Sequence, residues 1–221
     1  MMLELKSLKK SYVQGKETIE IFEDLNFTLE EGQRVAIMGK SGSGKSTFLS
    51  LVSGIIKADG GSISLKGVSY NDLEESEIND FRATNIGFVF QNFHLVSYLN
   101  ALENVMLPAK VCNISKPKEK AIELLTSVGL SHRLDHLPSQ LSGGEKQRVA
   151  IARALIHNPK IILADEPSGN LDEETGNAVM DKLFELIKKN GTTLILVTHS
   201  KDVAKRCEKT YELVLGNLNQ C

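Results

Sequence analysis

Apolar and polar residues alternate near the start of the chain, and the apolar residues then gather into short unbroken runs. Met2–Lys6 and Thr18–Leu29 have the alternation that is typical of half-buried β-strands. Arg34–Met38 is a short apolar strand that leads into a glycine-rich turn and a helix-like segment, and Ser62–Lys66 is a further short strand. We therefore expect the first part of the chain to be rich in β-structure.

The pattern changes in the middle of the chain, where the apolar positions take the spacing of helices. This spacing predicts helices at Ala101–Val111, Lys118–Val128 and Gly144–His157. Pro117 and Gly129 are suitable start and stop signals for the second of these helices. The middle of the chain is therefore expected to form an inserted helical region.

Strands and helices alternate again in the last third of the chain. Lys160–Ala164 and Thr192–Val197 are apolar throughout, the amphipathic segment Thr175–Lys189 lies between them, and a hairpin follows near Tyr211–Leu218. Apolar strands joined through helices indicate a parallel sheet that is covered on both faces. We expect an α/β fold with a mostly parallel core sheet and flanking helices, an N-terminal antiparallel β-subdomain and an inserted α-helical subdomain.

The chain length suits one large domain with a complete core, since 221 residues bury ample surface. We expect residues 1–91 and 159–221 to form the core together with the antiparallel β-subdomain, and residues 92–158 to form the helical subdomain. No second domain is expected after the final hairpin. The composition, 41% hydrophobic and 24% charged, is ordinary for a globular protein and leaves this picture unchanged.

Charge and cysteine content narrow the function classes. The net charge of −2 argues against a dedicated nucleic-acid binder, which usually has a strong basic surplus. Cys112, Cys207 and Cys221 are odd in number and lack zinc spacing, so a reduced cytosolic setting is the simple interpretation.

The N-terminus lacks a signal-peptide core, and no aliphatic stretch approaches the roughly 20 residues that cross a bilayer. If the protein acts at a membrane, another protein must anchor it.

The segment GKSGSGKS matches the phosphate-binding pattern GxxxxGK[ST], known as a P-loop. Glycines let the backbone wrap a phosphate chain, and the helix that follows adds the positive end of its dipole. Lys45 should reach the β- and γ-phosphates, and the Ser46 hydroxyl should coordinate Mg²⁺. A chance glycine-rich turn is the alternative, but a strand precedes the loop and a helix follows it, as phosphate binding requires. The expected nucleotide-binding residues here are Gly39, Lys40, Ser41, Gly42, Ser43, Gly44, Lys45, Ser46 and Thr47.

Two carboxylates, Asp165 and Glu166, follow the apolar run Ile161–Ala164. A parallel strand beside the P-loop strand would deliver both to the carboxyl edge of the sheet, where ligands bind. Asp165 is then placed to hold Mg²⁺ through water, and Glu166 to polarise the attacking water. The alternative is an ordinary polar strand end that enters a loop through Pro167. The upstream P-loop makes this alternative the less favoured one.

The segment LSGGEKQR, which continues as VAIARAL, has the features of a second phosphate-binding surface. Ser142 is a good N-cap, and the two glycines after it expose backbone N–H groups at the start of a helix. Taken alone, the segment could be an ordinary capped helix.

Together, the P-loop, the Asp-Glu strand end and LSGGEKQR resemble the motifs of the ABC ATPase family, and the resemblance covers nearly the whole chain. It implies an ABC ATPase that hydrolyses ATP with Mg²⁺ as a head-to-tail homodimer. The P-loop of one subunit and the LSGG segment of the other would enclose each ATP. The residues implied to contact the ATP of the partner subunit are Ser142, Gly143, Gly144 and Glu145. Glu145 stands where many members have glutamine, which leaves the contacts of that position open.

The resemblance assigns roles to further positions. Tyr12 is similar to the aromatic residue that stacks on adenine, and His199 to the switch histidine that touches the γ-phosphate. Gln91 is similar to the glutamine that meets Mg²⁺ and water. The implied catalytic residues are Glu166, His199 and Gln91, and the implied Mg²⁺ ligands are Ser46, Gln91 and Asp165. The implied residues of the loop that crosses to the partner subunit are Ser168, Asn170 and Asp172.

The runs GFVFQNFHLVSYLNALENVMLP and DEPSGNLD are close to the lipoprotein-releasing and macrolide-export type of ABC ATPase. This implies an integral membrane partner that docks near Asn92–Pro108, with Phe93, Leu95, Val96 and Leu99 as its apolar contacts. It also implies a cytoplasmic location, peripheral on the cytosolic face of the inner (plasma) membrane.

Two other kinds of ABC ATPase stay open at this point. One is a cell-division-type ATPase with a membrane partner that transports nothing. The other is a soluble ATPase of DNA repair or of the ribosome, although the chain has neither the long coiled coil nor the paired ATPase units of those proteins. No nucleic-acid partner is expected.

Overall fold

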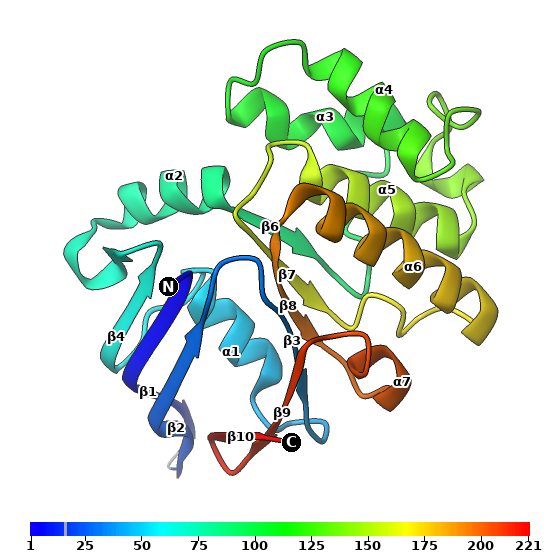
Figure 1. The fold of residues 1–221 in the computed structure, drawn as a ribbon. Helices are drawn as coiled ribbons and strands as arrows, with labels where there is room; N and C mark the ends of the chain where they lie inside the picture. The colour runs from blue at the N-terminus through cyan, green and yellow to red at the C-terminus, as the bar shows by residue number, and fades with distance from the viewer. Residues whose placement is uncertain (16) are drawn as a thin grey trace. The chain divides into compact units, whose positions relative to one another are not determined.

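The computed structural model describes residues 1–15 and 17–221. These residues divide into two units, of which unit 1 comprises Met1–Arg82 and Thr193–Cys221 and unit 2 comprises Ala83–Thr192. Figure 1 labels the α-helices and most of the strands of both. Unit 2 contains the whole predicted helical region together with strand and helix segments on either side of it. The subdomain boundaries at 91/92 and 158/159 stay a prediction.

An antiparallel sheet forms the N-terminal part of unit 1 (Figure 1). Its strand order is β2-β1-β4-β5, and these strands span Glu17–Leu29, Leu3–Gln14, Gly60–Leu65 and Val68–Ser69 respectively. Leu3, Leu5 and Leu8 of β1 are fully buried, because a half-buried strand packs one of its faces on the core. β1 runs well beyond the predicted end at Lys6. Irregularities shift its pairing with β2 between Leu5 and Ser11 and so hide the alternation from the sequence pattern.

A second set of strands in unit 1 surrounds β3 (Arg34–Met38). β3 pairs in parallel with β8 (Thr193–Val197) and with β9 (Lys209–Val214), and β9 forms an antiparallel hairpin with β10 (Asn217–Gln220). Val35, Ala36 and Ile37 have no exposed surface, which is the burial expected of a strand bonded on both sides. The helical segments of this unit are α1 (Lys45–Val52), the short 3₁₀ turn η1 (Tyr70–Asp72), the start of α2 (Glu75–Asn85) and α7 (Lys201–Ala204).

Unit 2 combines a parallel strand pair, β6 (Ile86–Val89) with β7 (Ile161–Asp165), and a group of helices. α5 (Gly143–Leu155) is central to this unit and contacts β6, α3 (Ala101–Val111), α4 (Pro117–Ser127) and α6 (Glu173–Asn190). A 3₁₀ turn, η2 (Pro138–Gln140), precedes α5. The parallel pair and its helices agree with the α/β class expected from the sequence.

Helix boundaries follow capping side chains closely. α3 has the bounds that the sequence predicts, and its N-cap Asn100 and N3 residue Glu103 form a capping box. α6 begins two residues before its predicted start because Asp172 accepts a hydrogen bond from Thr175 N at 2.9 Å. α2 has no predicted counterpart, since Ile78 is its only buried residue and its periodicity is correspondingly weak.

No helix within residues 1–15 and 17–221 combines the length and the apolar character needed to span a bilayer.

The packing of β4 against β1 generates a stability prediction. Gly61 has φ +79°, and a Cβ there would collide with the carbonyl oxygens of Lys6 and Ser7. Gly67 has φ +75°, but a Cβ there would meet open space. Gly61→Ala should therefore lower the free energy of unfolding by about 3–5 kcal/mol, and Gly67→Ala by only about 1–2 kcal/mol. Urea unfolding of both variants measures the difference, and equal losses would contradict this account of the packing.

Candidate functional site

The P-loop of unit 1 begins where β3 ends and closes at the first turn of α1. Gly42 and Gly44 have φ +79° and +99°, in the left-handed region that favours glycine. A Cβ at Gly44 would lie 2.7 Å from the Ile21 side chain, so glycine is required there for space as well as for conformation. The loop therefore has the tight backbone path that the sequence predicts.

Lys45 folds its side chain back over this loop. It is only 8% exposed, and its Nζ donates hydrogen bonds to the carbonyl oxygens of Gly39 (2.9 Å) and Lys40 (2.8 Å). The N-cap of α1 is Gly44, which provides no side-chain cap for the first N–H groups of the helix. Helix-start N–H groups and an ammonium next to them make a cradle for an anion. Ser46 and Thr47 lie in the first turn of α1, where the cradle ends.

A cavity of about 440 Å³ lies beside the P-loop within unit 1. Its walls come from P-loop residues Lys40–Ser43, from β2, from the end of β9 and from the turn between β9 and β10. Ile19 of β2 lines it, and Tyr12 of β1 stands directly opposite Ile19 in the β1–β2 register. Side chains of directly opposed residues share a face of the sheet. Tyr12, which is 42% exposed, therefore lies on the same face of the sheet as Ile19.

His199 reaches the same edge of the unit 1 sheet as the P-loop. Ile37 of β3 pairs with Val197 of β8, and both strands run in parallel, so the residues that follow them emerge together. Thr198, between Val197 and His199, is fixed by a hydrogen bond from its N–H to Ile37 O at 3.2 Å. The His199 side chain itself is exposed.

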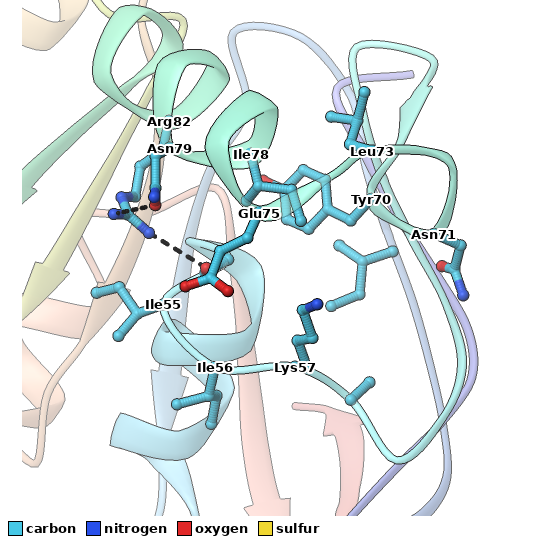
Figure 2. A pocket seen from close by; sticks show the side chains of 13 residues that line it. Ile55, Ile56, Lys57, Tyr70, Asn71, Leu73, Glu75, Ile78, Asn79 and Arg82 are labelled. Carbon is cyan, nitrogen blue, oxygen red and sulfur yellow. Dashed lines mark hydrogen bonds between the residues drawn. The ribbon is translucent and has the colours of Figure 1, made fainter.

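A second cavity in unit 1, of about 510 Å³, holds none of the predicted site residues. It lies among the segment after α1, η1 and α2, and Ile55, Ile56 and Ile78 supply apolar walls (Figure 2). Arg82 closes one side, where it donates to Gly54 O (3.1 Å) and to Asn79 Oδ1 (2.8 Å). The two cavities are thus separate features of this unit.

In unit 2, the segment after β6 is bonded to the loop after β7. Gln91 Nε2 donates to Asn170 Oδ1 at 3.1 Å, and Asn170 Nδ2 donates back to Gln91 O at 3.1 Å and to Asn92 Oδ1 at 2.8 Å. A Cβ at Gly169 would approach Gln91 Nε2 to 2.9 Å, so glycine lets the two segments meet. The structure therefore brings together two segments of unit 2 that carry predicted site residues, the Gln91 segment and the Ser168–Asp172 loop.

Asp165 is the last residue of β7 in unit 2, and Glu166 follows it directly. Glu166 has φ +44°, a conformation that non-glycine residues rarely adopt and that clusters at functional sites. Its carbonyl oxygen accepts a hydrogen bond from Gly169 N at 2.9 Å, which closes a tight turn. Asp172 caps α6, and the hydrogen bond from Thr175 N lowers the pKa of the Asp172 carboxyl.

Ser142 and Glu145 form a capping box at the start of α5. Ser142 Oγ accepts from Glu145 N at 3.2 Å, and Glu145 Oε2 accepts from Ser142 N at 2.8 Å. A Cβ at Gly144 would collide with the Thr175 side chain of α6, and a Cβ at Gly143 would lie 3.0 Å from Leu171. Gly144 is therefore required where the start of α5 packs against α6, and Gly143 gives close but less strict packing against the loop that follows β7.

Glu145, whose contacts the sequence left open, is bound by Arg133. Arg133 Nε donates to Glu145 Oε1 at 3.0 Å, and its Nη1 lies 3.0 Å from His136 Nε2. The Ser142 N–H and then Arg133 hold the pKa of Glu145 below its ordinary value. Both oxygens of the carboxylate are thus bound within the chain, and its negative charge is balanced locally.

The segment Asn92–Leu99 is held by two polar residues that sequence reasoning missed. Asn104, fully buried in α3, donates to Leu99 O (2.8 Å) and Val96 O (3.1 Å), and Arg153 of α5 donates to Phe93 O (2.7 Å). The only sequence signal for Asn104 and Arg153 is that each is a polar residue on the apolar face of a helix. Phe93, Leu95, Val96 and Leu99 are consequently half-buried rather than exposed, and Tyr98 is the exposed large side chain, at 79%.

The P-loop before α1 and the glycine-rich, capped start of α5 are the two ABC ATPase motifs that the sequence resembles. The family model described as ABC transporter matches residues 22–169. The chain belongs to this ABC transporter family.

Relatives and solved structures agree. The lipoprotein-releasing system ATP-binding protein LolD of Treponema denticola is 45% identical over 98% of this chain and 96% of its own length. YbbA of Escherichia coli K12, described as an uncharacterized ABC transporter ATP-binding protein, is 45% identical over 99% of this chain and 97% of its own. The solved dimeric post-hydrolysis state of the ATP-binding cassette MJ0796, bound to ADP and Pi, has a TM-score of 0.92 and 40% identity, covering 100% of this chain and 98% of that one.

These matches confirm the ABC ATPase fold and the enzyme class expected from the sequence. The chain is an ATP-binding, ATP-hydrolysing subunit of the ABC transporter family, similar to the LolD group. The rival classes, cell-division-type and soluble ABC ATPases, are not favoured. The roles of individual residues stay predictions.

The Arg133–Glu145 pair predicts a pH-dependent contribution to stability. Glu145→Gln keeps the hydrogen-bonding shape of the capping box but removes the charge, and should lower the free energy of unfolding by about 0.5–1 kcal/mol at pH 7. Because the folded pKa of Glu145 is lowered, this contribution is present above the ordinary glutamate pKa and is lost as the pH falls through the folded value. Urea unfolding at neutral pH and in acid measures it, and Lys6→Met, which removes an exposed ion pair with Glu4, is the control. A difference between wild type and Glu145→Gln that does not shrink in acid would refute it.

Proposed function

We propose that this chain is the ATP-driven motor of a membrane transport complex of the lipoprotein-release or macrolide-export type. Two copies would associate head to tail around two ATP molecules. The observation that carries the proposal is that the chain has two separate helix starts suited to phosphate, the P-loop before α1 and Ser142–Gly144 before α5. The dimeric MJ0796 structure with ADP and Pi, at 40% identity, supports the same arrangement.

In the proposed binding step, the P-loop N–H groups and Lys45 hold the phosphates. Lys45 would exchange the carbonyl oxygens of Gly39 and Lys40 for phosphate oxygens, since an ammonium binds anionic oxygen more strongly than neutral carbonyl. Tyr12 would stack on adenine, which its exposure and its position opposite Ile19 support. Ser142 and the glycines after it would contact the γ-phosphate of the ATP bound by the other subunit.

The donor set proposed for Mg²⁺ is a hydroxyl from Ser46, an amide oxygen from Gln91 and a carboxylate from Asp165. These are hard oxygen donors with a single carboxylate, which fits a cation that keeps several waters and takes its remaining ligands from phosphate. Gln91 bonds Asn170 through its amide nitrogen, so its oxygen is the atom it has to offer a cation. Within the described residues, no cluster of three or more His, Cys, Asp or Glu could form an all-protein cage. When bound, Mg²⁺ would neutralise charge on the phosphates.

In the proposed chemical step, Glu166 polarises the attacking water. His199 would touch the γ-phosphate from the end of β8, and Gln91 would meet the water from the segment after β6. The hydrogen bonds between Gln91 and Asn170 would link this glutamine to the loop of Ser168, Asn170 and Asp172 that crosses to the other subunit.

The proposed membrane partner is an integral membrane protein that docks near Asn92–Pro108. Relatives named as lipoprotein-releasing system ATP-binding proteins, at 44–46% identity, support a partner of that type. The chain would then be peripheral on the cytosolic face of the inner membrane. The anchoring of Asn92–Leu99 by Asn104 and Arg153 supports a preformed surface there.

Three variants separate binding, dimerisation and chemistry. Glu166→Gln should hydrolyse ATP about 10²–10⁴-fold more slowly, because it loses general-base assistance, and should run as a dimer with Mg-ATP and as a monomer with ADP. Lys45→Ala should lose ATP binding, and Ser142→Arg should bind ATP but stay monomeric. Size-exclusion chromatography with light scattering gives the oligomeric state of each. A Glu166→Gln protein with wild-type hydrolysis, or monomeric with Mg-ATP, would overturn the assignment.

The docking surface has its own test. Tyr98→Asp should abolish co-purification of the membrane partner from detergent-solubilised membranes and leave ATP binding unchanged, because Tyr98 is 79% exposed within the proposed surface. Val111→Asp is the matched control, since Val111 is 70% exposed but lies outside Asn92–Pro108. Retention of the partner by Tyr98→Asp would show that docking occurs elsewhere.

A further inference from the structure

Asp59 is an exposed carboxylate that is nevertheless fully engaged with β1. It lies in the link between α1 and β4, and its Oδ1 accepts from Lys10 Nζ at 2.7 Å. Its Oδ2 accepts from Ser11 N at 2.7 Å and from Ser11 Oγ at 3.0 Å. Asp59 N in turn donates to Lys9 O at 2.9 Å. The residue therefore holds three successive positions of β1, directly before Tyr12.

These bonds occur where the regular pairing of β1 is weakest. The pairing of β1 with β2 shifts between Leu8 and Lys10 and again between Lys10 and Ser11. On its other side, the register with β4 ends at Lys9, opposite Gly60. Asp59 thus bonds the Ser11 N–H just beyond the last β4 partner, where β4 no longer pairs with β1. Without Asp59, the segment that carries Tyr12 would be held by β2 alone.

Lys10 links Asp59 to the Tyr12 ring itself. Its Nζ lies 5.4 Å from the centroid of that ring, within the range of a cation–π contact. Lys10 and Tyr12 are two residues apart on a strand, so their side chains lie on the same face. The Lys10 side chain is mostly buried, at 14% exposed. Lys10 and the Ser11 N–H also lower the pKa of Asp59, so the carboxylate is charged at neutral pH.

We propose that Asp59 is a positioning residue for nucleotide binding: through Ser11 and Lys10 it holds the Tyr12 ring ready to stack on the base. This inference rests on the proposed stacking role of Tyr12. An aromatic ring already held in its bound orientation loses less conformational freedom when the base arrives. The effect should therefore depend on the base and leave the phosphates unaffected.

The experiment compares ATP with inorganic tripolyphosphate, which has the phosphates without the base. Dissociation constants with Mg²⁺ are measured for wild type, Asp59→Ala, Tyr12→Ala and the double variant. Asp59→Ala should raise the dissociation constant for ATP about 3- to 10-fold, the effect of losing one preorganised side chain, and leave that for tripolyphosphate unchanged. The increase should vanish in the Tyr12→Ala background. Asp202→Ala, which removes an exposed ion pair with Lys205, is the control and should change neither constant.

Each outcome is decisive. If Tyr12→Ala leaves ATP affinity unchanged, the stacking role is wrong and the inference falls with it. If Tyr12→Ala weakens ATP binding but Asp59→Ala does not, or if Asp59→Ala acts equally on tripolyphosphate or in the Tyr12→Ala background, the inference alone is wrong. Lys10→Met removes the ring contact but keeps the Ser11 bonds, and should give the same base-dependent loss to a smaller degree. It provides the test if Asp59→Ala proves unfolded by circular dichroism.

Discussion

The pairing of β3 on both sides, with β8 and with β9, is the constraint on which unit 1 depends. A strand bonded on both edges and buried on both faces cannot shift its register without exposing its apolar residues. The residues after Met38 and after Val197 are therefore delivered to one edge of the sheet. That edge is where the P-loop turns into α1 and where His199 stands. The position of these candidate groups thus depends on the burial of three apolar side chains, Val35, Ala36 and Ile37.

In unit 2, most candidate site residues lie on loops and at helix starts, which strand pairing does not hold in place. Loops need side-chain bonds to hold a shape that strand pairing does not provide. The reciprocal bonds of Gln91 and Asn170, the capping box of Ser142 and the Arg133–Glu145 pair supply them. The Gln91–Asn170 and Arg133–Glu145 bonds each join two segments, so a change at one of these residues also affects the segment that its partner belongs to.

The sequence predicted those features that local chemistry determines. The P-loop and the capped helix start of α5 are short motifs in which neighbouring residues supply all that is needed, and the predicted bounds of α3 matched because its capping box lies within four residues. Bonds between distant residues leave no such pattern. Neither Arg133 with Glu145 nor Arg153 with the carbonyl of Phe93 could be predicted from spacing. α2 was missed for a related reason: a polar helix that buries one isoleucine has almost no periodicity to detect.

The left-handed backbone at Glu166 has a consequence for how this position can vary in evolution. Asparagine and aspartate tolerate that conformation best, yet both are one methylene shorter than glutamate. Aspartate would bring the carboxylate closer to the backbone and away from the water that Glu166 is proposed to polarise. Glutamine keeps the length and loses the charge, and the β-branched residues resist the turn. The left-handed backbone thus favours asparagine or aspartate, whereas the proposed chemistry needs the longer glutamate. Few substitutions at this position would therefore be neutral in evolution.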